Sequence, residues 1–351
     1  MAATAAVLLV LVGVGYFLKQ DGRSARVDGK VGKPVLDQVD LTAAKKILID
    51  AGPQKVTLKS GPEGWQVAEQ GDFPADDLKL RKFLISLANE IIQHRVTENP
   101  ARLPQLGLLT QEENGNKFEE EKTGTLVSLV NQEGQTFYQV LVGKSRIPAK
   151  GLTSAFGGQY IRFPEEKAAY LVAETLRVES ESRRWLDGTV LKFDRNKLLK
   201  SLRVTRGKGG RFALSREKPE GPWKLQGAAS KPVNATEIDD LASQISDIKL
   251  HQVAQQGRSA AELGREKVAE VKMELFDQRT YRMTIGEKKA DQDFRYVTFS
   301  AEIDPSVTDE ALKKEVEAFN NRFRNRIVSI YDWEAQRILK SRKALLKKED
   351  Q

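Results

Sequence analysis

Histidine is the side chain best suited to acid–base chemistry near neutral pH, and this 351-residue sequence has only two, His94 and His251. Cysteine is absent, which excludes disulfides, thiolate nucleophiles and thiolate metal sites. Two isolated imidazoles do not complete a zinc site unless carboxylates supply the remaining ligands. The composition therefore disfavours hydrolytic and metal chemistry. We predict a non-enzymatic protein without a catalytic residue, a cofactor or a bound metal.

Four motifs with possible chemistry do not meet their own requirements. The run Gly143-Lys144-Ser145 looks like the end of a phosphate-binding loop, but Tyr138 stands where that loop needs its first glycine. The glycine-rich run at 151–158 lacks the strand-to-helix context of a dinucleotide site. The acidic clusters at 112–113 and 119–121 lack the alternating spacing of a calcium loop, and Gly-x-Ser-x-Gly does not occur. Carboxylates brought together from distant positions remain an alternative, which would make the protein an envelope hydrolase.

The first apolar segment, residues 2–18, contains no charge and ends against Lys19. Seventeen helical residues span about 25 Å, near the lower limit for crossing a bilayer core. We predict a transmembrane anchor at 2–18 followed by a linker at 19–35. A cleaved signal peptide and a buried helix are the alternatives, although no small-residue cleavage site is evident and the segment lacks a polar face.

The membrane orientation follows from charge and from the size of the remaining chain. Five Lys or Arg residues follow the apolar segment before residue 36 and none precedes it. Read literally, this distribution places the bulk of the chain in the cytoplasm. Anchors of this kind usually begin with a basic stretch, which would lie upstream of Met1, and long domains translocate largely regardless of charge. We therefore expect a single-pass protein of the bacterial inner membrane, mostly extracytoplasmic.

An internal repeat with an offset of 158 residues organises the remaining chain. Each copy has a tryptophan, a proline nine residues later, and a polar helix-capping residue two further on. The signature residues are Trp65, Pro74 and Asp76 in the first copy and Trp223, Pro232 and Asn234 in the second, with Gly143 and Gly286 closing a later hairpin.

The physical meaning of the signature is the same in both copies. The tryptophan is expected to pack beside a helix, the proline to keep the incoming chain extended, and the polar residue to cap the helix. Four apolar residues at helical spacing then form one buried face. They are Leu80, Phe83, Leu84 and Leu87 in the first copy and Ile238, Leu241, Ala242 and Ile245 in the second.

Downstream segments repeat with small changes of length. Alternating residues predict β-hairpins at 125–143 and 271–286, and the strands 159–163 and 295–299 also correspond. Each copy then has an expected helix, at 175–185 and 309–324 respectively. The fold class is therefore α+β, with two tandem copies of one antiparallel-sheet-plus-helix domain behind the transmembrane helix.

Domain boundaries are placed at an apolar–aspartate pair that occurs three times, as Leu36-Asp37, Phe193-Asp194 and Tyr331-Asp332. The pair is interpreted as the entry to each copy, with the third occurrence starting a copy that is not completed. The first repeat domain is predicted at 36–192, the second at 193–333, and a basic C-terminal helix or tail at 334–351.

The pattern resembles an uncharacterised bacterial family known as domain of unknown function 4340. The resemblance rests on the N-terminal anchor, the tryptophan strand, Pro74-Ala75-Asp76 and a hairpin ending in Val142-Gly143-Lys144. It covers nearly the whole chain, but its motifs are structural and specify no chemistry. Members of the family look like extracytoplasmic companions of ABC-type transporters related to gliding motility. The resemblance thus implies a membrane complex with ABC permease and ATPase subunits.

The expected function is a non-enzymatic scaffold or binding subunit beside such a transporter. Residues 322–351 carry nine Lys or Arg against four Asp or Glu, so an alternative is an envelope module that binds lipid or another polyanion. Nucleic acid is not an expected partner, because no aromatic residue lies among the final basic residues and no recognition motif occurs. The sequence does not identify a small-molecule ligand.

Overall fold

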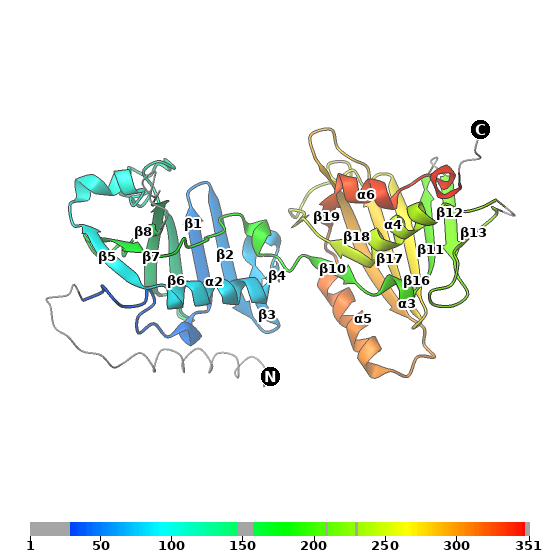
Figure 1. The fold of residues 1–351 in the computed structure, drawn as a ribbon, viewed down its shortest axis with the longest axis horizontal. Coiled ribbons are helices and arrows are strands. Elements are labelled where there is room, and N and C mark those ends of the chain that lie inside the picture. Colours follow the sequence, from blue (N-terminus) through cyan, green and yellow to red (C-terminus); the bar gives the residue numbers. More distant parts are fainter. Residues whose placement is uncertain (1–28, 147–156, 208–209, 229–230, 348–351) are drawn as a thin grey trace. The chain divides into compact units, whose positions relative to one another are not determined.

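The computed structural model describes residues 29–146, 157–207, 210–228 and 231–347. The chain forms two compact units (Figure 1). The first unit consists of residues up to 69 together with 75–185, and the second consists of 70–74 together with 186 onward. Each unit is built on one antiparallel sheet with a few helices, so the predicted α+β class is confirmed.

Eight strands of the first unit form its sheet in the order β3-β2-β1-β6-β7-β8-β9-β5. Its neighbouring strands are mostly sequential hairpins, as the alternating sequence around 125–143 predicted. The strands are β1 (Lys46–Ala51), β2 (Gln54–Gly61), β3 (Gly64–Val67), β5 (Ile92–Thr97), β6 (Thr125–Val130), β7 (Thr136–Ser145), β8 (Gln159–Arg162) and β9 (Ala169–Val172). The short strand β4 (Phe73–Pro74) belongs to the second unit.

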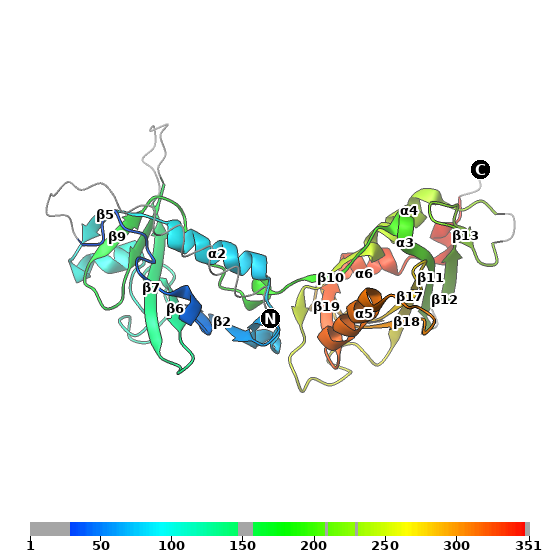
Figure 2. The same ribbon diagram turned by 90° about the horizontal axis from the view of Figure 1, so that it is seen from below.

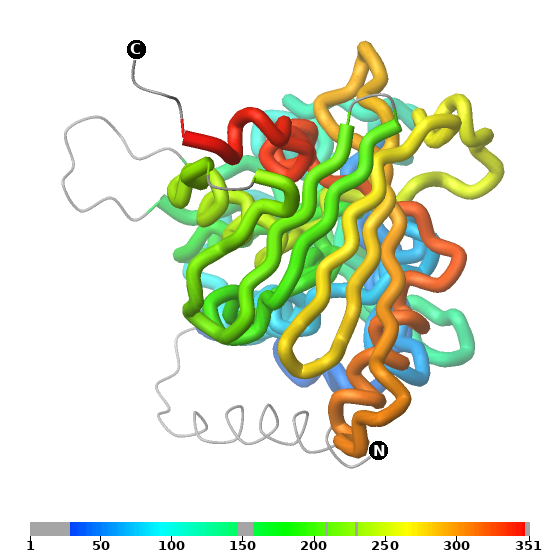
Figure 3. Tube along the Cα trace, turned by 90° about the vertical axis from the view of Figure 1, so that its right-hand side faces the viewer, coloured from blue at the N-terminus to red at the C-terminus, as the bar shows by residue number. Residues whose placement is uncertain are grey.

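The sheet of the second unit has the strand order β13-β12-β11-β16-β17-β18-β19-β15, and Figure 3 shows its long strands side by side. A separate pair joins β10 (Thr189–Lys192) to β14 (Asp247–Lys249). The other strands are β11 (Leu199–Arg206), β12 (Gly210–Ser215), β13 (Lys224–Leu225), β15 (Gln252–Val253), β16 (Val268–Leu275), β17 (Arg279–Gly286), β18 (Phe294–Ile303) and β19 (Val328–Tyr331).

The two sheets use the same order of strands. Counted from β3, which carries Trp65, the order in the first sheet is β3-β2-β1-β6-β7-β8-β9-β5. Counted from β13, which follows Trp223, the order in the second sheet is β13-β12-β11-β16-β17-β18-β19-β15. The strands of the two sheets correspond one by one. The registers also correspond: Leu141 pairs with Arg162 in the first unit, and Thr284 pairs with Thr298 in the second. Residues at matched positions of the two sheets can therefore be compared directly.

One face of the first sheet is covered by α2 (Asp77–Asn89), which Figure 2 shows on one side of the sheet. The helix buries Leu80, Phe83 and Leu87, which the 3.6-residue period predicted. They complete a core with inward-facing aliphatic residues such as Ile47 and Leu58. A short 3-10 helix, η4 (Ser182–Trp185), closes this core, because Trp185 is fully buried and meets Phe83 edge-on at 5.3 Å.

The second unit has α4 (Ala235–Ser246) in the corresponding place, with Ile238, Leu241 and Ile245 buried. Its core is closed by α6 (Asp332–Ile338) and the 3-10 helix η6 (Arg342–Leu345), whose Leu345 is fully buried. The sequence suggested one continuous helix from Glu334. Instead, α6 ends at Ile338 and the chain turns before η6, which lets both elements place apolar side chains in the core.

Helix α5 (Glu310–Phe323) confirms the predicted helix at 309–324, but the proposed counterpart at 175–185 is wrong. That segment contains only η4, and it follows β9, whereas α5 lies between β18 and β19. The first unit joins β8 to β9 with six residues, 163–168, and has no helix there. Leu176 and Trp185 are both buried, but Leu176 lies in extended chain and Trp185 in a single 3-10 turn. Their burial therefore does not indicate a helix.

Short elements complete the fold. The 3-10 helices η1 (Leu41–Ala43), η2 (Ala68–Gln70) and η3 (Pro100–Leu106) belong to connections of the first repeat, and α3 (Arg195–Leu198) precedes β11. The end of the expected linker is also ordered: Val35 is buried and donates its N–H to the Glu90 carbonyl at 2.8 Å.

The predicted anchor at 2–18 lies outside the described residues. Within the described ranges, no helix combines the length and the apolar character needed to cross a bilayer.

Candidate binding surface

The signature residues beside the two helices have equivalent structural tasks. Asp76 caps α2 by accepting from the Lys79 N–H at 2.9 Å, and Asn234 caps α4 by accepting from the Glu237 N–H at 3.3 Å. Their own N–H groups donate to the Trp185 carbonyl at 2.7 Å and the Leu345 carbonyl at 2.9 Å. Residue 345, in the basic C-terminal segment, thus takes the place of Trp185.

The signature prolines are held by the same two segments. The Pro74 carbonyl accepts from the Asp187 N–H at 3.0 Å, and the Pro232 carbonyl accepts from the Lys347 N–H at 2.9 Å. Both prolines lead the extended chain into a helix cap, as their fixed φ angle favours. These contacts use backbone atoms throughout, so they explain why the pattern repeats without implying a reaction.

The signature glycines sit where a loop crosses the hairpin. A Cβ on Gly143 would lie 2.5 Å from the Leu106 carbonyl oxygen, and one on Gly286 would lie 2.8 Å from the Gly264 carbonyl oxygen. The crossing loops turn at left-handed glycines, Gly107 with φ 66° and Gly264 with φ 62°. Each glycine pair therefore serves close backbone approach.

The two signature tryptophans are less buried than expected. Trp65, on β3, and Trp223, just before β13, are both half-buried, and the fully buried tryptophan beside a helix is Trp185. Trp223 lies under the Arg216 guanidinium, 4.7 Å from its ring centre. Both signature tryptophans thus lie near the edge of their sheets.

The two histidines lie in different units and in different surroundings. His94 is exposed in β5, five residues beyond the end of α2. His251 lies between β14 and β15, where its ring is 4.3 Å from the Tyr331 ring and 5.7 Å from the Phe294 ring. It belongs to an aromatic group and not to a pair of imidazoles.

The outer face of the first sheet, opposite α2, is covered by the loop that contains η3. Five buried residues join loop and sheet: Leu103, Leu106, Leu108, Leu141 and Ala169. Beside them, the buried Arg162 donates to the Leu108 carbonyl at 3.1 Å and pairs with Glu113 of the same loop. This contact is mainly apolar, and its single guanidinium has a carboxylate partner.

The matching face of the second sheet is polar. Thr284 stands where the first sheet has Leu141, and Arg265 follows the loop glycine in the place of Leu108. The Arg265 guanidinium donates to the hydroxyls of Thr284 at 3.1 Å and Thr298 at 3.3 Å. The buried Nη1 atom of Arg265 has no partner within the described part of the chain. Desolvation by burial lowers the pKa of Arg265.

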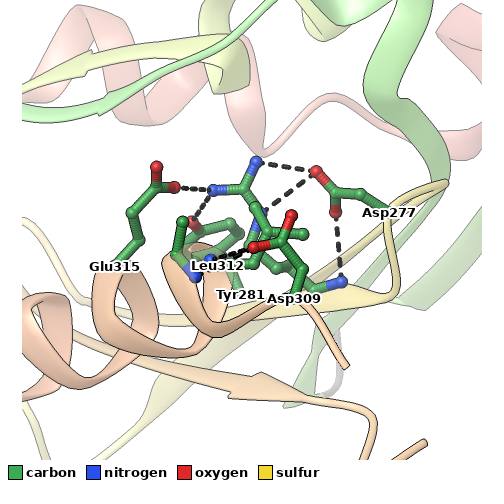
Figure 4. Close-up of polar contacts among 7 residues, drawn as sticks. Asp277, Tyr281, Asp309, Leu312 and Glu315 are labelled. Atoms are coloured by element: carbon green, nitrogen blue, oxygen red, sulfur yellow. Dashed lines mark hydrogen bonds and ion pairs between the residues drawn. The ribbon is translucent and has the colours of Figure 1, made fainter. Parts of the chain in front are cut away.

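A second polar group ties α5 to the β16–β17 turn (Figure 4). Arg279 donates to Asp277 at 2.7 Å, to Glu315 of α5 at 2.8 Å and to the Tyr281 hydroxyl at 3.3 Å. Burial alone would lower the pKa of Arg279, but these acidic neighbours raise it, and burial raises the pKa of Tyr281. Asp309 caps the same helix. The guanidinium is fully engaged, so this cluster anchors α5.

An aromatic strip lies on the outer face of the second unit at β18 and β19. It consists of His251, Phe294, Tyr296, Tyr331 and Trp333. Paired strand positions place Phe294 opposite Tyr331, and the Tyr331 and Trp333 rings are stacked with centres 6.5 Å apart. Trp333 keeps 54% of its surface exposed. The first unit has Gly158 and Ala173 at the positions of Phe294 and Tyr331, so it lacks this strip.

A buried carboxylate stands beside the strip. Asp332 accepts from Arg295 at 2.6 Å, from Lys288 at 3.1 Å and from Gln336 at 2.6 Å. Burial alone would raise its pKa, but these three donors hold the pKa of Asp332 below the ordinary aspartate value. The neighbouring Glu334 has a pKa raised by burial. Two cations thus face one ionised carboxylate, next to an exposed tryptophan.

The family model described as Domain of unknown function (DUF4340) matches residues 65–254. This span is more than half of the 351 residues and runs from β3 in the first unit to β15 in the second. The chain belongs to the DUF4340 family. No curated protein and no solved structure matches it. The resemblance inferred from the signature residues is therefore correct, and the family description assigns no activity.

Within the described residues of this DUF4340 chain, no group of three acidic or histidine side chains is placed to hold a metal ion. The feature that sequence reasoning missed is the aromatic strip. Its members come from residues 251, 294–296 and 331–333, which only strand pairing brings together. The one signal in the sequence is the pair Tyr331-Asp332, which the repeat pattern marks as the start of an incomplete third copy.

Proposed function

We propose that this DUF4340 chain is a non-enzymatic binding subunit made of two copies of one α+β domain and held at the bacterial inner membrane by residues 2–18. The observation that carries the proposal is the structural use of the repeated residues. Asp76 and Asn234 cap equivalent helices, and Gly143 and Gly286 permit equivalent loop crossings. A duplicated frame whose repeated residues serve packing suits a protein that presents surfaces to partners.

The proposed partners are the permease and ATPase subunits of an ABC-type transporter, with the two domains on the extracytoplasmic side. Family resemblance supports the choice of partner. The contrast between the two units supports binding as such, because the second unit exposes Trp333 and has large aromatic residues where the first unit has Gly158 and Ala173. Exposed Trp, Tyr and Arg side chains are typical of protein interfaces.

Co-purification tests the partner. The full chain, tagged at its C-terminus and expressed at its native level, is extracted in mild detergent and its bound proteins are identified by mass spectrometry. Permease and ATPase subunits should be retained in constant ratio to the chain. Recovery of the chain alone, under conditions that keep other inner-membrane complexes intact, would contradict the proposal.

The anchor needs a separate test. Replacing Leu9 and Leu11 with arginine puts two charges in the apolar segment, each costing about 2.5–3.5 kcal/mol for insertion at a helix centre. The double variant should leave the membrane fraction, whereas exchanging the same leucines for valine should not. If the arginine variant stays in the membrane fraction after a carbonate wash, residues 2–18 are not the anchor.

A further inference from the structure

Trp333 is held rigidly although it is exposed. It is the second residue of α6, whose Ala335 and Ile338 are fully buried. The Glu334 carboxylate accepts from the Tyr331 N–H at 3.0 Å and so fixes the first turn of the helix. A rigid aromatic side chain loses little conformational entropy when a partner covers it. The position is therefore prepared for binding without further ordering.

One basic group faces the exposed ring. The Arg337 guanidinium, one turn along α6, lies 5.5 Å from the Trp333 ring centre and is exposed. No ion pair joins Arg337 to another of the described residues. Lys288 and Arg295, by contrast, share the carboxylate of Asp332. Arg337 is therefore the cation beside Trp333 that is available to a partner.

The fold itself does not require this surface. The first unit builds the same strand order with Gly158 and Ala173 in place of Phe294 and Tyr331. Four large apolar side chains are exposed in the described ranges, and Trp333 is the one in the second unit. Trp333 keeps 54% of its surface exposed, because stacking on Tyr331 covers only one side of its ring.

We propose that the aromatic strip, with Trp333 at its exposed end and Arg337 beside it, is the docking site for an acidic segment of a partner protein. The inference rests on the proposed function as a binding subunit and adds the surface and the chemistry of the partner. Trp, Tyr and Arg dominate the residues on which protein affinity depends, and the exposed Arg337 beside Trp333 selects a partner segment that carries carboxylates.

Two variants of the full chain test the site. Trp333→Ala removes the exposed ring and Arg337→Glu reverses the adjacent charge. Each should reduce the amount of co-purified transporter subunits at least about tenfold, because an interface hot spot contributes more than one order of magnitude in affinity. Trp333→Phe should restore part of the retention. The matched control is Leu78→Ala, which removes a side chain that is 60% exposed on α2 and should change nothing.

Photo-crosslinking identifies what touches the site. A benzoylphenylalanine placed at position 333 in living cells should form an adduct with a protein, and mass spectrometry of the linked peptide should show a segment with net negative charge. The same group at position 78 should not give this adduct. Adducts with lipid alone, or with a segment of net positive charge, would overturn the inference. Far-UV circular dichroism confirms that each variant is folded.

The two proposals can fail separately. If the unaltered chain retains no transporter subunit, the proposed function fails and the docking site fails with it. If the unaltered chain retains the subunits and both Trp333→Ala and Arg337→Glu retain them equally well, only the docking site is refuted.

Discussion

The two units share a strand order but treat the outer face of their sheets differently. In the first unit the crossing loop packs leucines on the sheet, and the buried Arg162 has Glu113 as its partner. In the second unit Arg265 and two threonines occupy the same place, and the adjoining edge carries the aromatic strip. The shared strand order thus determines where a loop crosses each sheet. The side chains at the crossing can differ, so that one crossing serves packing and the other is available for binding.

The largest expected loss of stability concerns the residues that complete the two cores, Trp185 in the first unit and Leu345 in the second. Trp185→Ala should destabilise the first unit by about 3–5 kcal/mol and Leu345→Ala the second by about 2–5 kcal/mol, because both side chains are fully buried. Urea denaturation measures the loss, and hydrogen exchange of α2 and α4 locates it. An unchanged stability on Leu345→Ala would mean that the basic C-terminal segment is no part of the core.

A smaller effect compares the two loop crossings. Gly143→Ala places a Cβ 2.5 Å from a carbonyl oxygen, whereas Gly286→Ala places it 2.8 Å from one. Backbone atoms cannot move aside cheaply, so we expect losses of about 2–3 kcal/mol and about 1–2 kcal/mol respectively. Chemical denaturation of both variants measures the order. Equal tolerance of alanine would show that the loops do not approach the hairpins this closely.

The buried carboxylate of the second unit gives the next comparison. Asp332→Asn should cost about 1–3 kcal/mol near neutral pH, since hydrogen bonds to a charged group are lost. The folded protein depresses the pKa of Asp332, so its contribution is present above the ordinary aspartate pKa and is lost as pH falls through the depressed value. Urea midpoints between pH 7 and pH 2 should therefore fall less steeply with acid in the variant.

The control for this experiment is Glu174→Gln, at the matching position of the first unit, where the side chain is exposed. This variant should follow the unaltered chain at every pH. A steeper acid response in Asp332→Asn than in Glu174→Gln would contradict the assigned role of Asp332.

Much of the fold could be predicted because its signals are local. The caps at Asp76 and Asn234, the buried faces of α2 and α4, and the two hairpins follow from periods of 3.6 and 2 within short windows. Local patterns misled where burial had another cause. Trp185 and Leu345 lie in short turns that the tertiary structure pulls into the core, so their spacing does not mark a helix.

The candidate binding surface could not be predicted in the same way. Phe294 and Tyr331 face each other only because β18 pairs with β19, and α5 separates these strands along the chain. Exposure is also invisible in the sequence: Trp65 carries the strongest repeat signal and is half-buried, whereas Trp333 carries none and is exposed. A repeat marks what two copies share, and here the candidate site lies in what they do not share.

The smallest expected effect concerns Arg265. Arg265→Leu gives the second unit the residue type that Leu108 supplies in the first. It removes two hydrogen bonds to threonines, but it also removes a buried Nη1 that has no partner among the described residues. The two hydroxyls remain bonded to each other at 2.6 Å. Because an unsatisfied buried donor costs about 1–3 kcal/mol, we expect a change within about 1 kcal/mol, on the stabilising side.

Arg258→Leu is the control for Arg265→Leu, since Arg258 is exposed and bonds one phenol. Urea denaturation of both variants should give midpoints close to that of the unaltered chain. A loss above about 2 kcal/mol in Arg265→Leu alone would contradict this expectation. It would show that the guanidinium holds the crossing loop, and that the polar face of the second unit stabilises the fold as the leucines stabilise the first.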